Sequence, residues 1–147
     1  MELRAPMCDT FIHVDVVIPT QTKYLALIAS IGERIAKELD NFTGDREALS
    51  YQLNLVLTEA TVNVIKHACE DDIKNCVRVT INLQEDALNI KVYDYGQGFD
   101  LEAVPLPDLD HPGESGMGLF LIRSLMDSVT YTQHADYNVL EIIKYLK

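Results

Sequence analysis

Three polar residues follow one another at one-turn spacing within an apolar-striped stretch, residues 46–69. Glu59, Asn63 and His67 are each four positions apart, so a helix would place them on one stripe of its surface. A carboxylate can accept a proton, and an amide oxygen is a hard, neutral ligand suited to Mg²⁺. The stripe therefore fits either a bound ion and its ligand or a plain solvated helix face.

A glycine-rich segment directly follows the apolar stretch 88–93, with Asp94 ahead of Gly96 and Gly98. Glycines at alternate positions let the backbone turn sharply and let a flat ligand approach it. An aspartate at the end of a strand can accept a hydrogen bond from an exocyclic amine. A ligand-binding turn and a simple glycine-rich turn both fit this segment.

A second glycine-rich segment leads into an apolar run, residues 119–126, and contains Gly113, Gly116 and Gly118. Glycines that open a helix leave its first amide N–H groups accessible, and together with the helix dipole these groups favour an anion. No Gly-Lys-Ser/Thr follows and no strand immediately precedes, so neither a Walker loop nor a dinucleotide-binding turn is indicated.

The elements that must position these residues are predicted from hydrophobic periodicity. Strands are expected over 11–18, 76–83, 88–93, 129–132 and 138–146, and helices over 20 or 22 to 39, 46–69 and 119–126. A long loop rich in glycine and proline, residues 94–118, has the length of a functional lid. This order predicts an α+β fold, a two-layer sandwich with helices on one face of a largely antiparallel sheet.

Length and composition restrict the class of protein. A chain of 147 residues without repeats or linkers suits one domain, residues 1–147 with a core over about 11–146. The net charge of −11 argues against binding to nucleic acid or to an anionic membrane, because such binding needs cations that neutralise phosphates. No signal peptide, membrane span or cysteine framework is evident, so we expect a cytoplasmic protein.

Taken together and in order, the three motifs resemble those of a known superfamily. Glu59-x-x-x-Asn63, Asp94-x-Gly96-x-Gly98 and the Gly113–Gly118 segment look like the N, G1 and G2 boxes of the GHKL, or histidine-kinase-like, ATPases. More narrowly, LTEATVNVIKHA and GMGLFLIRSLMDSV resemble segments of the anti-sigma factor serine/threonine kinases. The family fold is an α/β sandwich with helices over a mixed, mainly antiparallel sheet, which agrees with the predicted order.

The resemblance implies a role for each matching residue. Glu59 would be the catalytic general base, and Asn63 would coordinate the Mg²⁺ that bridges the ATP phosphates. Asp94 would bind the adenine amino group, and His67 would supply a supporting hydrogen bond. Further nucleotide contacts would come from Gly96, Gly98, Gly113, Gly116, Met117, Gly118 and Leu119, with a mobile lid over about residues 100–118.

The resemblance also implies a reaction and partners. Members of this family phosphorylate a serine or threonine of a small STAS-type anti-anti-sigma protein, and they hold either that protein or a sigma factor by partner switching. They use ATP and Mg²⁺ and commonly form homodimers. Such a chain would act in transcription regulation without touching nucleic acid or membrane itself.

Two features depart from the family pattern. The lid carries several acids together with Pro105, Pro107 and Pro112, which raises the cost of holding a triphosphate there. Val139 occupies a position where many members have threonine, which predicts the loss of one adenine-side hydrogen bond.

Two other functions are compatible with the sequence. One is a non-catalytic, nucleotide-dependent switch module that binds a partner such as a PP2C-type phosphatase. The other is a structural α+β scaffold whose glycines serve only as turns. Glu59 favours the kinase, because a pure binding module has no need of a base at that place.

Overall fold

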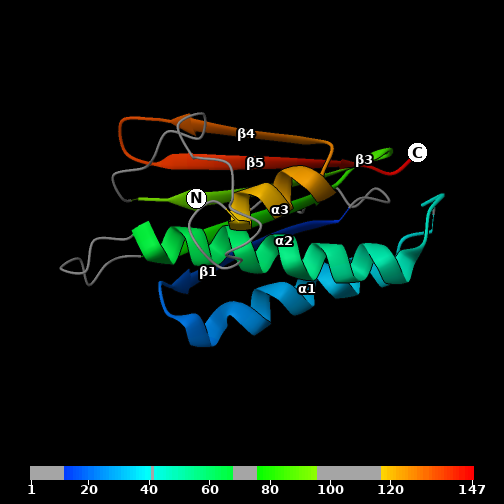
Figure 1. The fold of residues 1–147 in the computed structure, drawn as a ribbon, viewed down its shortest axis with the longest axis horizontal. Coiled ribbons are helices and arrows are strands. Elements are labelled where there is room, and N and C mark those ends of the chain that lie inside the picture. Colours follow the sequence, from blue (N-terminus) through cyan, green and yellow to red (C-terminus); the bar gives the residue numbers. More distant parts are fainter. Residues whose placement is uncertain (1–11, 41, 68–75, 96–116) are drawn as a thin grey trace, which may run out of the picture.

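The computed structural model describes residues 12–40, 42–67, 76–95 and 117–147, and Figure 1 shows how they are arranged. The elements in chain order are the strand β1 (His13–Pro19), the short 3-10 helix η1 (Thr22–Tyr24), the helices α1 (Leu25–Lys37) and α2 (Arg46–His67), the strands β2 (Cys76–Leu83) and β3 (Ala87–Asp94), the helix α3 (Met117–Leu125), and the strands β4 (Ser128–Gln133) and β5 (Asn138–Tyr145).

The five strands form one sheet in the order β1-β2-β3-β5-β4. Each of the four pairings between described strands is antiparallel, and β3 is the central strand. Buried and half-buried residues alternate along β3 and β5, so one face of the sheet contributes to the core. The helices cover that face (Figure 1). The expected α+β sandwich of helices over a mainly antiparallel sheet is therefore confirmed.

Helix α2 is the middle helix of the helical layer, with α1 and α3 packed against it (Figure 1). Gly32 of α1 is buried, and a Cβ atom at this position would lie 2.3 Å from Leu57 Cδ1 of α2. The glycine thus lets the two helices approach closely. The large side chains buried between the layers include Ile28, Leu49, Leu53, Leu57, Leu88, Ile90, Ile122 and Ile142.

The start of the first helix differs from the sequence prediction. The chain enters through η1, and the backbone N–H of Leu25 donates to the Thr22 carbonyl. Neither η1 nor α1 has a side-chain cap, and α1 begins at Leu25 rather than at residue 20 or 22. The next helix does have one: Asp45 Oδ1 accepts hydrogen bonds from the backbone N–H of Glu47 at 2.9 Å and of Ala48 at 3.4 Å.

Two element ends near the predicted loop also differ. Strand β3 continues to Asp94, and α3 begins at Met117, two residues before the predicted helix start. Asp94 and Gly118 therefore belong to a strand and a helix rather than to the predicted loop. Most of the predicted lid, residues 96–116, lies outside the described residues.

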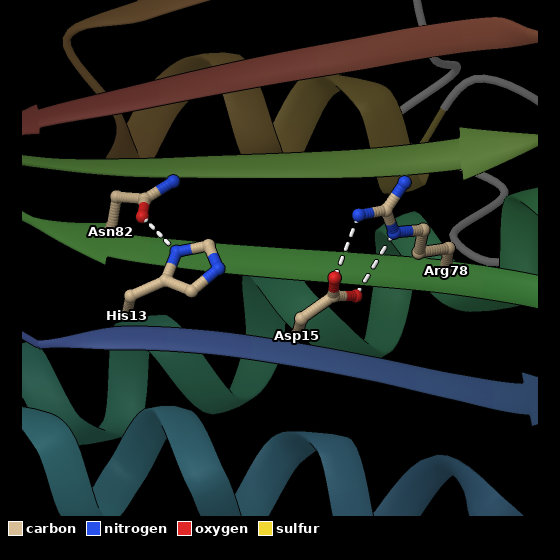
Figure 2. Close-up of polar contacts among 4 residues, drawn as sticks. All are labelled: His13, Asp15, Arg78 and Asn82. Atoms are coloured by element: carbon tan, nitrogen blue, oxygen red, sulfur yellow. Dashed lines mark hydrogen bonds and ion pairs between the residues drawn. The ribbon is translucent and has the colours of Figure 1, made fainter. Parts of the chain in front are cut away.

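The other face of the sheet carries polar pairs that link neighbouring strands (Figure 2). Arg78 of β2 donates twice to Asp15 of β1, from Nε to Oδ1 at 2.9 Å and from Nη2 to Oδ2 at 2.6 Å. These hydrogen bonds hold the pKa of the Asp15 carboxyl below its ordinary value. His13 and Asn82 form a third side-chain hydrogen bond between the same strands, and the Arg78 guanidinium lies 5.2 Å from the centre of the Tyr93 ring. The edge strand β1 is thus fastened to the sheet by side chains as well as by backbone.

Candidate functional site

The structure brings the first and third sequence motifs into contact. Glu59 and Asn63 lie one turn apart on α2, and both are half-buried. Gly118 lies in the first turn of α3, where a Cβ atom would be 2.6 Å from Glu59 Oε2. A side chain larger than hydrogen at this position would overlap the carboxylate oxygen, so glycine is what lets the two helices share this place. The carboxylate consequently lies at the amino-terminal turn of α3.

Asp94 is the last residue of β3, and its side chain is buried with 6% exposed. It follows Leu88, Ile90 and Val92 at a spacing of two, so it points to the same face of the sheet as they do, toward the helices. A buried carboxylate is costly without hydrogen-bond partners. The partners of Asp94 therefore matter for its function.

Two side chains from neighbouring strands donate to Asp94. Asn138, directly opposite on β5, donates from Nδ2 to Oδ1 at 2.9 Å. Tyr131 of β4 donates its hydroxyl to Oδ2 at 3.3 Å. Each oxygen of the carboxylate thus accepts a hydrogen bond from a different strand. A carboxylate has about four acceptor positions, so Asp94 can accept more hydrogen bonds than these two.

Asp94 and the Glu59–Asn63 pair are positioned by elements that run in the same direction (Figure 1). Glu59 and Asn63 are in the carboxyl-terminal half of α2, and Asp94 is at the carboxyl-terminal end of β3. Both polar groups therefore lie toward the same end of the molecule, where α3 begins above α2 (Figure 1).

Several predicted site residues fall outside what the structure describes. Gly96, Gly98, Gly113 and Gly116 are outside the described residues, as are the side chains of His67 and Met117. Leu119 is described, and its side chain is buried in the core with 7% exposed. Only its backbone N–H, in the first turn of α3, could therefore contribute to a site.

Val139, where the sequence predicted a missing hydrogen bond, lies opposite Tyr93 in the sheet. The residue opposite Asp94 is its neighbour Asn138. A donor on β5 is therefore present beside Asp94, although not at the position expected.

Asn138 and Tyr131 are site residues that the sequence reasoning missed. A signal for Asn138 exists: it precedes Leu140 and Ile142 at a spacing of two, so a polar side chain occupies the core face of a strand. Tyr131 likewise shares the alternation of Val129 along β4 and packs against the core. Which strand would lie beside Asp94 could not be read from these patterns.

The described residues contain no group of three or more His, Cys, Asp and Glu side chains that could hold a metal ion. A Mg²⁺ ion held mainly by substrate phosphates needs no such cage, and one amide oxygen such as that of Asn63 is a suitable protein ligand. The donor set around α2 is thus compatible with a phosphate-bound Mg²⁺.

An open groove of about 520 Å³ lies elsewhere on the molecule. It is lined by His13, Asn82 and the turn between β2 and β3. Since β3 begins beside that turn and ends at Asp94, the groove is at the opposite end of the strand and is separate from the candidate site.

Among the described helices, none has both the length and the apolar character required to span a bilayer.

This fold and arrangement define the class of protein. The family model described as a histidine kinase-like ATPase domain matches residues 19–144, and the chain belongs to this family.

Curated relatives give a narrower likeness. The chain is 27% identical over 149 residues to the serine-protein kinase RsbW of Bacillus cereus (strain ZK / E33L), covering 96% of this chain and 89% of the relative. It is 28% identical over 142 residues to the serine-protein kinase RsbW of Bacillus velezensis, covering 91% of this chain and 86% of that protein.

Solved structures show the same fold. The histidine kinase domain of the Erythrobacter litoralis EL346 blue-light activated histidine kinase matches with a TM-score of 0.55 at 22% identity, and the match covers 88% of this chain but only 62% of that domain. The Acinetobacter baumannii histidine kinase AdeS matches with a TM-score of 0.52 at 13% identity, over 91% of this chain and 68% of that one.

Proposed function

We propose that this chain is an ATP-dependent serine/threonine protein kinase of the anti-sigma factor type. The observation that carries the proposal is the contact between Glu59 and Gly118, which puts a carboxylate on the same stripe as Asn63 and at the first turn of α3. The likeness to serine-protein kinases over nearly the whole chain supports it.

Each polar group then has one task in the proposed site. Asp94 accepts a hydrogen bond from the adenine amine, and Asn63 offers its amide oxygen to Mg²⁺. When bound, that ion neutralises charge on the ATP phosphates. The backbone N–H groups of the first turn of α3 face the same region and favour phosphate oxygens.

The chemical step is the transfer of the γ-phosphoryl group to a hydroxyl of a partner protein. A bond forms between the partner's hydroxyl oxygen and the γ-phosphorus, the bond from that phosphorus to the β-phosphate oxygen breaks, and ADP leaves. Glu59 takes the hydroxyl proton as the new bond forms. Positioning and charge neutralisation supply most of the rate, since phosphoryl transfer asks for little covalent chemistry from the protein.

The proposed acceptor is a STAS-type anti-anti-sigma protein, and the proposed alternative partner is a sigma factor held in exchange for it. The family resemblance also suggests a homodimer in the cytoplasm. None of these roles requires a nucleic-acid surface, which agrees with the net charge of −11.

The decisive experiment incubates the chain with γ-labelled ATP, Mg²⁺ and a STAS protein. We expect label on the STAS protein. Glu59→Gln should keep nucleotide affinity and lower the transfer rate by about 10²–10⁴-fold, the usual contribution of a general base. Glu85→Gln is the matched control, because Glu85 is exposed in the turn between β2 and β3, and it should transfer at the unaltered rate.

Three outcomes contradict the proposal. Unchanged transfer by Glu59→Gln would remove Glu59 as the base. A nucleotide-dependent complex that never carries label would indicate a switch module, with a PP2C-type phosphatase among the partners to try next. Failure to bind nucleotide at millimolar concentration would leave a structural scaffold.

A further inference from the structure

The hydrogen bonds to Asp94 come from residues to which neither the sequence motifs nor the comparisons assign a role. Asp94, Asn138 and Tyr131 lie on β3, β5 and β4, which follow one another in the sheet, on the face that contacts the helices. Asn138 is directly opposite Asp94, whereas Tyr131 is opposite Leu140, two residues further along β5. Asn138 is itself buried with 4% exposed. One buried and one half-buried polar side chain thus converge on one buried carboxylate.

Each of these two hydrogen bonds restricts the orientation of the Asp94 carboxyl group. Asn138 faces Oδ1 with its amide nitrogen, which can only donate, and the Tyr131 hydroxyl donates to Oδ2. Each oxygen accepts a hydrogen bond from a different strand, so the plane of the carboxyl group is fixed. The two hydrogen bonds hold Asp94 as an acceptor of fixed orientation.

The distinction matters for purine recognition. Adenine carries an amine at position 6, which donates a hydrogen bond. Guanine and hypoxanthine, the base of inosine, carry a carbonyl there, which accepts one. A carboxylate that can only accept pairs with the amine and repels the carbonyl. A protonated or freely turning carboxyl group could pair with either.

We propose that Asn138 and Tyr131 are positioning residues that set the preference for adenine over 6-oxopurines, by holding Asp94 as an acceptor of fixed orientation. This inference rests on the proposed function, because it requires Asp94 to face the base of a bound nucleotide. Neither residue needs to touch the nucleotide itself.

The test measures dissociation constants for ATP and ITP, each with Mg²⁺, by calorimetry. ITP differs from ATP at position 6 of the purine, where it carries the carbonyl. Asn138→Asp puts a second carboxylate beside Asp94, and two carboxylates at hydrogen-bond distance share a proton. Asp94 then loses the amide donor that held its Oδ1 as an acceptor of fixed orientation. We expect the unaltered chain to bind ATP at least tenfold more tightly than ITP, and Asn138→Asp to reduce that ratio by about tenfold or more.

The chain offers a matched control on the same two strands. Asn89 of β3 donates from Nδ2 to Glu141 Oε2 of β5 at 3.1 Å, so Asn89→Asp creates the same carboxylate pair. It is five residues before Asp94, about 17 Å along the strand. We expect Asn89→Asp to leave the ATP:ITP ratio within twofold of the unaltered value.

A second variant covers the case in which Asn138→Asp does not fold. Tyr131→Phe keeps the ring that packs in the core and removes only the hydroxyl. It should lower the ATP:ITP ratio by about threefold to tenfold, the usual range for one hydrogen bond.

The outcomes separate this inference from the proposed function. If both variants lose affinity for ATP and ITP by the same factor, the two residues are merely structural and the inference is overturned. ATP binding by the unaltered chain without preference over ITP also overturns it, while leaving the kinase proposal in place. If the unaltered chain binds neither nucleotide, both proposals fall.

Discussion

At the scale of single residues, the missing side chain of Gly118 decides where the Glu59 carboxylate can lie. A Cβ atom at this position would be 2.6 Å from Glu59 Oε2 but 3.6 Å from Glu59 Cβ, so only the far end of the glutamate is in conflict. The carboxylate can move aside by rotating about its side-chain bonds. Such a rotation costs little folding energy but removes the proposed base from its place.

This asymmetry predicts a variant that loses activity and keeps its stability. Gly118→Ala should change the free energy of unfolding by less than about 1 kcal/mol, because alanine is favoured in helices by a similar amount. It should lower the phosphoryl-transfer rate at least tenfold, because Glu59 no longer points at the acceptor. Urea unfolding and the labelled-ATP assay measure the two effects.

A second glycine serves as the comparison. At Gly32 the added Cβ would meet Leu57 Cδ1 at 2.3 Å within the packed helical layer. Gly32→Ala should therefore cost about 1–3 kcal/mol of stability, as overpacked cores do, and leave the transfer rate of the folded protein unchanged. If Gly118→Ala instead loses stability and keeps its rate, the assigned role of the glycine is wrong.

At the scale of elements, periodicity predicted the helices and strands, and it is clearest where apolar residues recur along one face, as in α1 and β3. Strand β2 occurs at the predicted residues, Cys76–Leu83. Besides the start of the first helix, two errors fall where a residue is polar or is a glycine yet sits inside an element: Asp94 ends β3, and Gly118 is in α3. The local sequence pattern predicts a loop for both residues. Tertiary contacts place them in a strand and a helix instead.

The candidate site was predictable in part for the same reason. Glu59 and Asn63 are fixed by helical spacing alone, which a sequence reveals. The contact of Asn138 with Asp94 joins residues 44 positions apart, through a strand order that places β5 beside β3. Many strand orders satisfy the same local patterns, so no single-sequence pattern identifies this partner.

The edge strand β1 gives a prediction that depends on pH. The hydrogen bonds from Arg78 lower the pKa of Asp15, so the ionised carboxylate favours the folded state. This contribution is complete above the pKa that Asp15 has in the unfolded chain, and it disappears as the pH falls through the lower folded value. Asp15→Asn should accordingly be less stable than the unaltered chain at pH 7, with the difference shrinking below about pH 4.

Urea midpoints at pH 7, 5 and 3 measure that difference. Asp136→Asn, in the exposed turn between β4 and β5, controls for the loss of one negative charge. A difference between Asp15→Asn and the unaltered chain that is as large at pH 3 as at pH 7 would show that the carboxylate charge is not what matters.

At the scale of the whole molecule, the net charge of −11 repels the negatively charged triphosphate of ATP. Binding must overcome this repulsion. The groups that we propose for this are a bound cation and the helix dipole of α3. Nucleotide binding should therefore depend strongly on Mg²⁺, and through linkage it should stabilise the entire fold.

A thermal unfolding series tests this dependence. At a Mg²⁺–ATP concentration about 100 times the dissociation constant, the chain should gain about 2.7 kcal/mol and the Tm should rise by about 5–11 °C. Excess EDTA should remove most of the rise, and Asn63→Ala should abolish it. An equal rise with ATP in EDTA would argue against the metal role of Asn63.

The direct opposition of Asp94 and Asn138 ties the chemistry of the site to the alignment of two strands. Adjacent side chains on a strand point to opposite faces, so a slip of β5 by one residue would bring Val139 beside Asp94 and turn Asn138 away. Substitutions at either end of the β4–β5 hairpin that shift this register should thus remove the proposed preference for adenine while the sheet stays folded and covered by helices. The proposed nucleotide selectivity therefore depends on the register of β5 against β3.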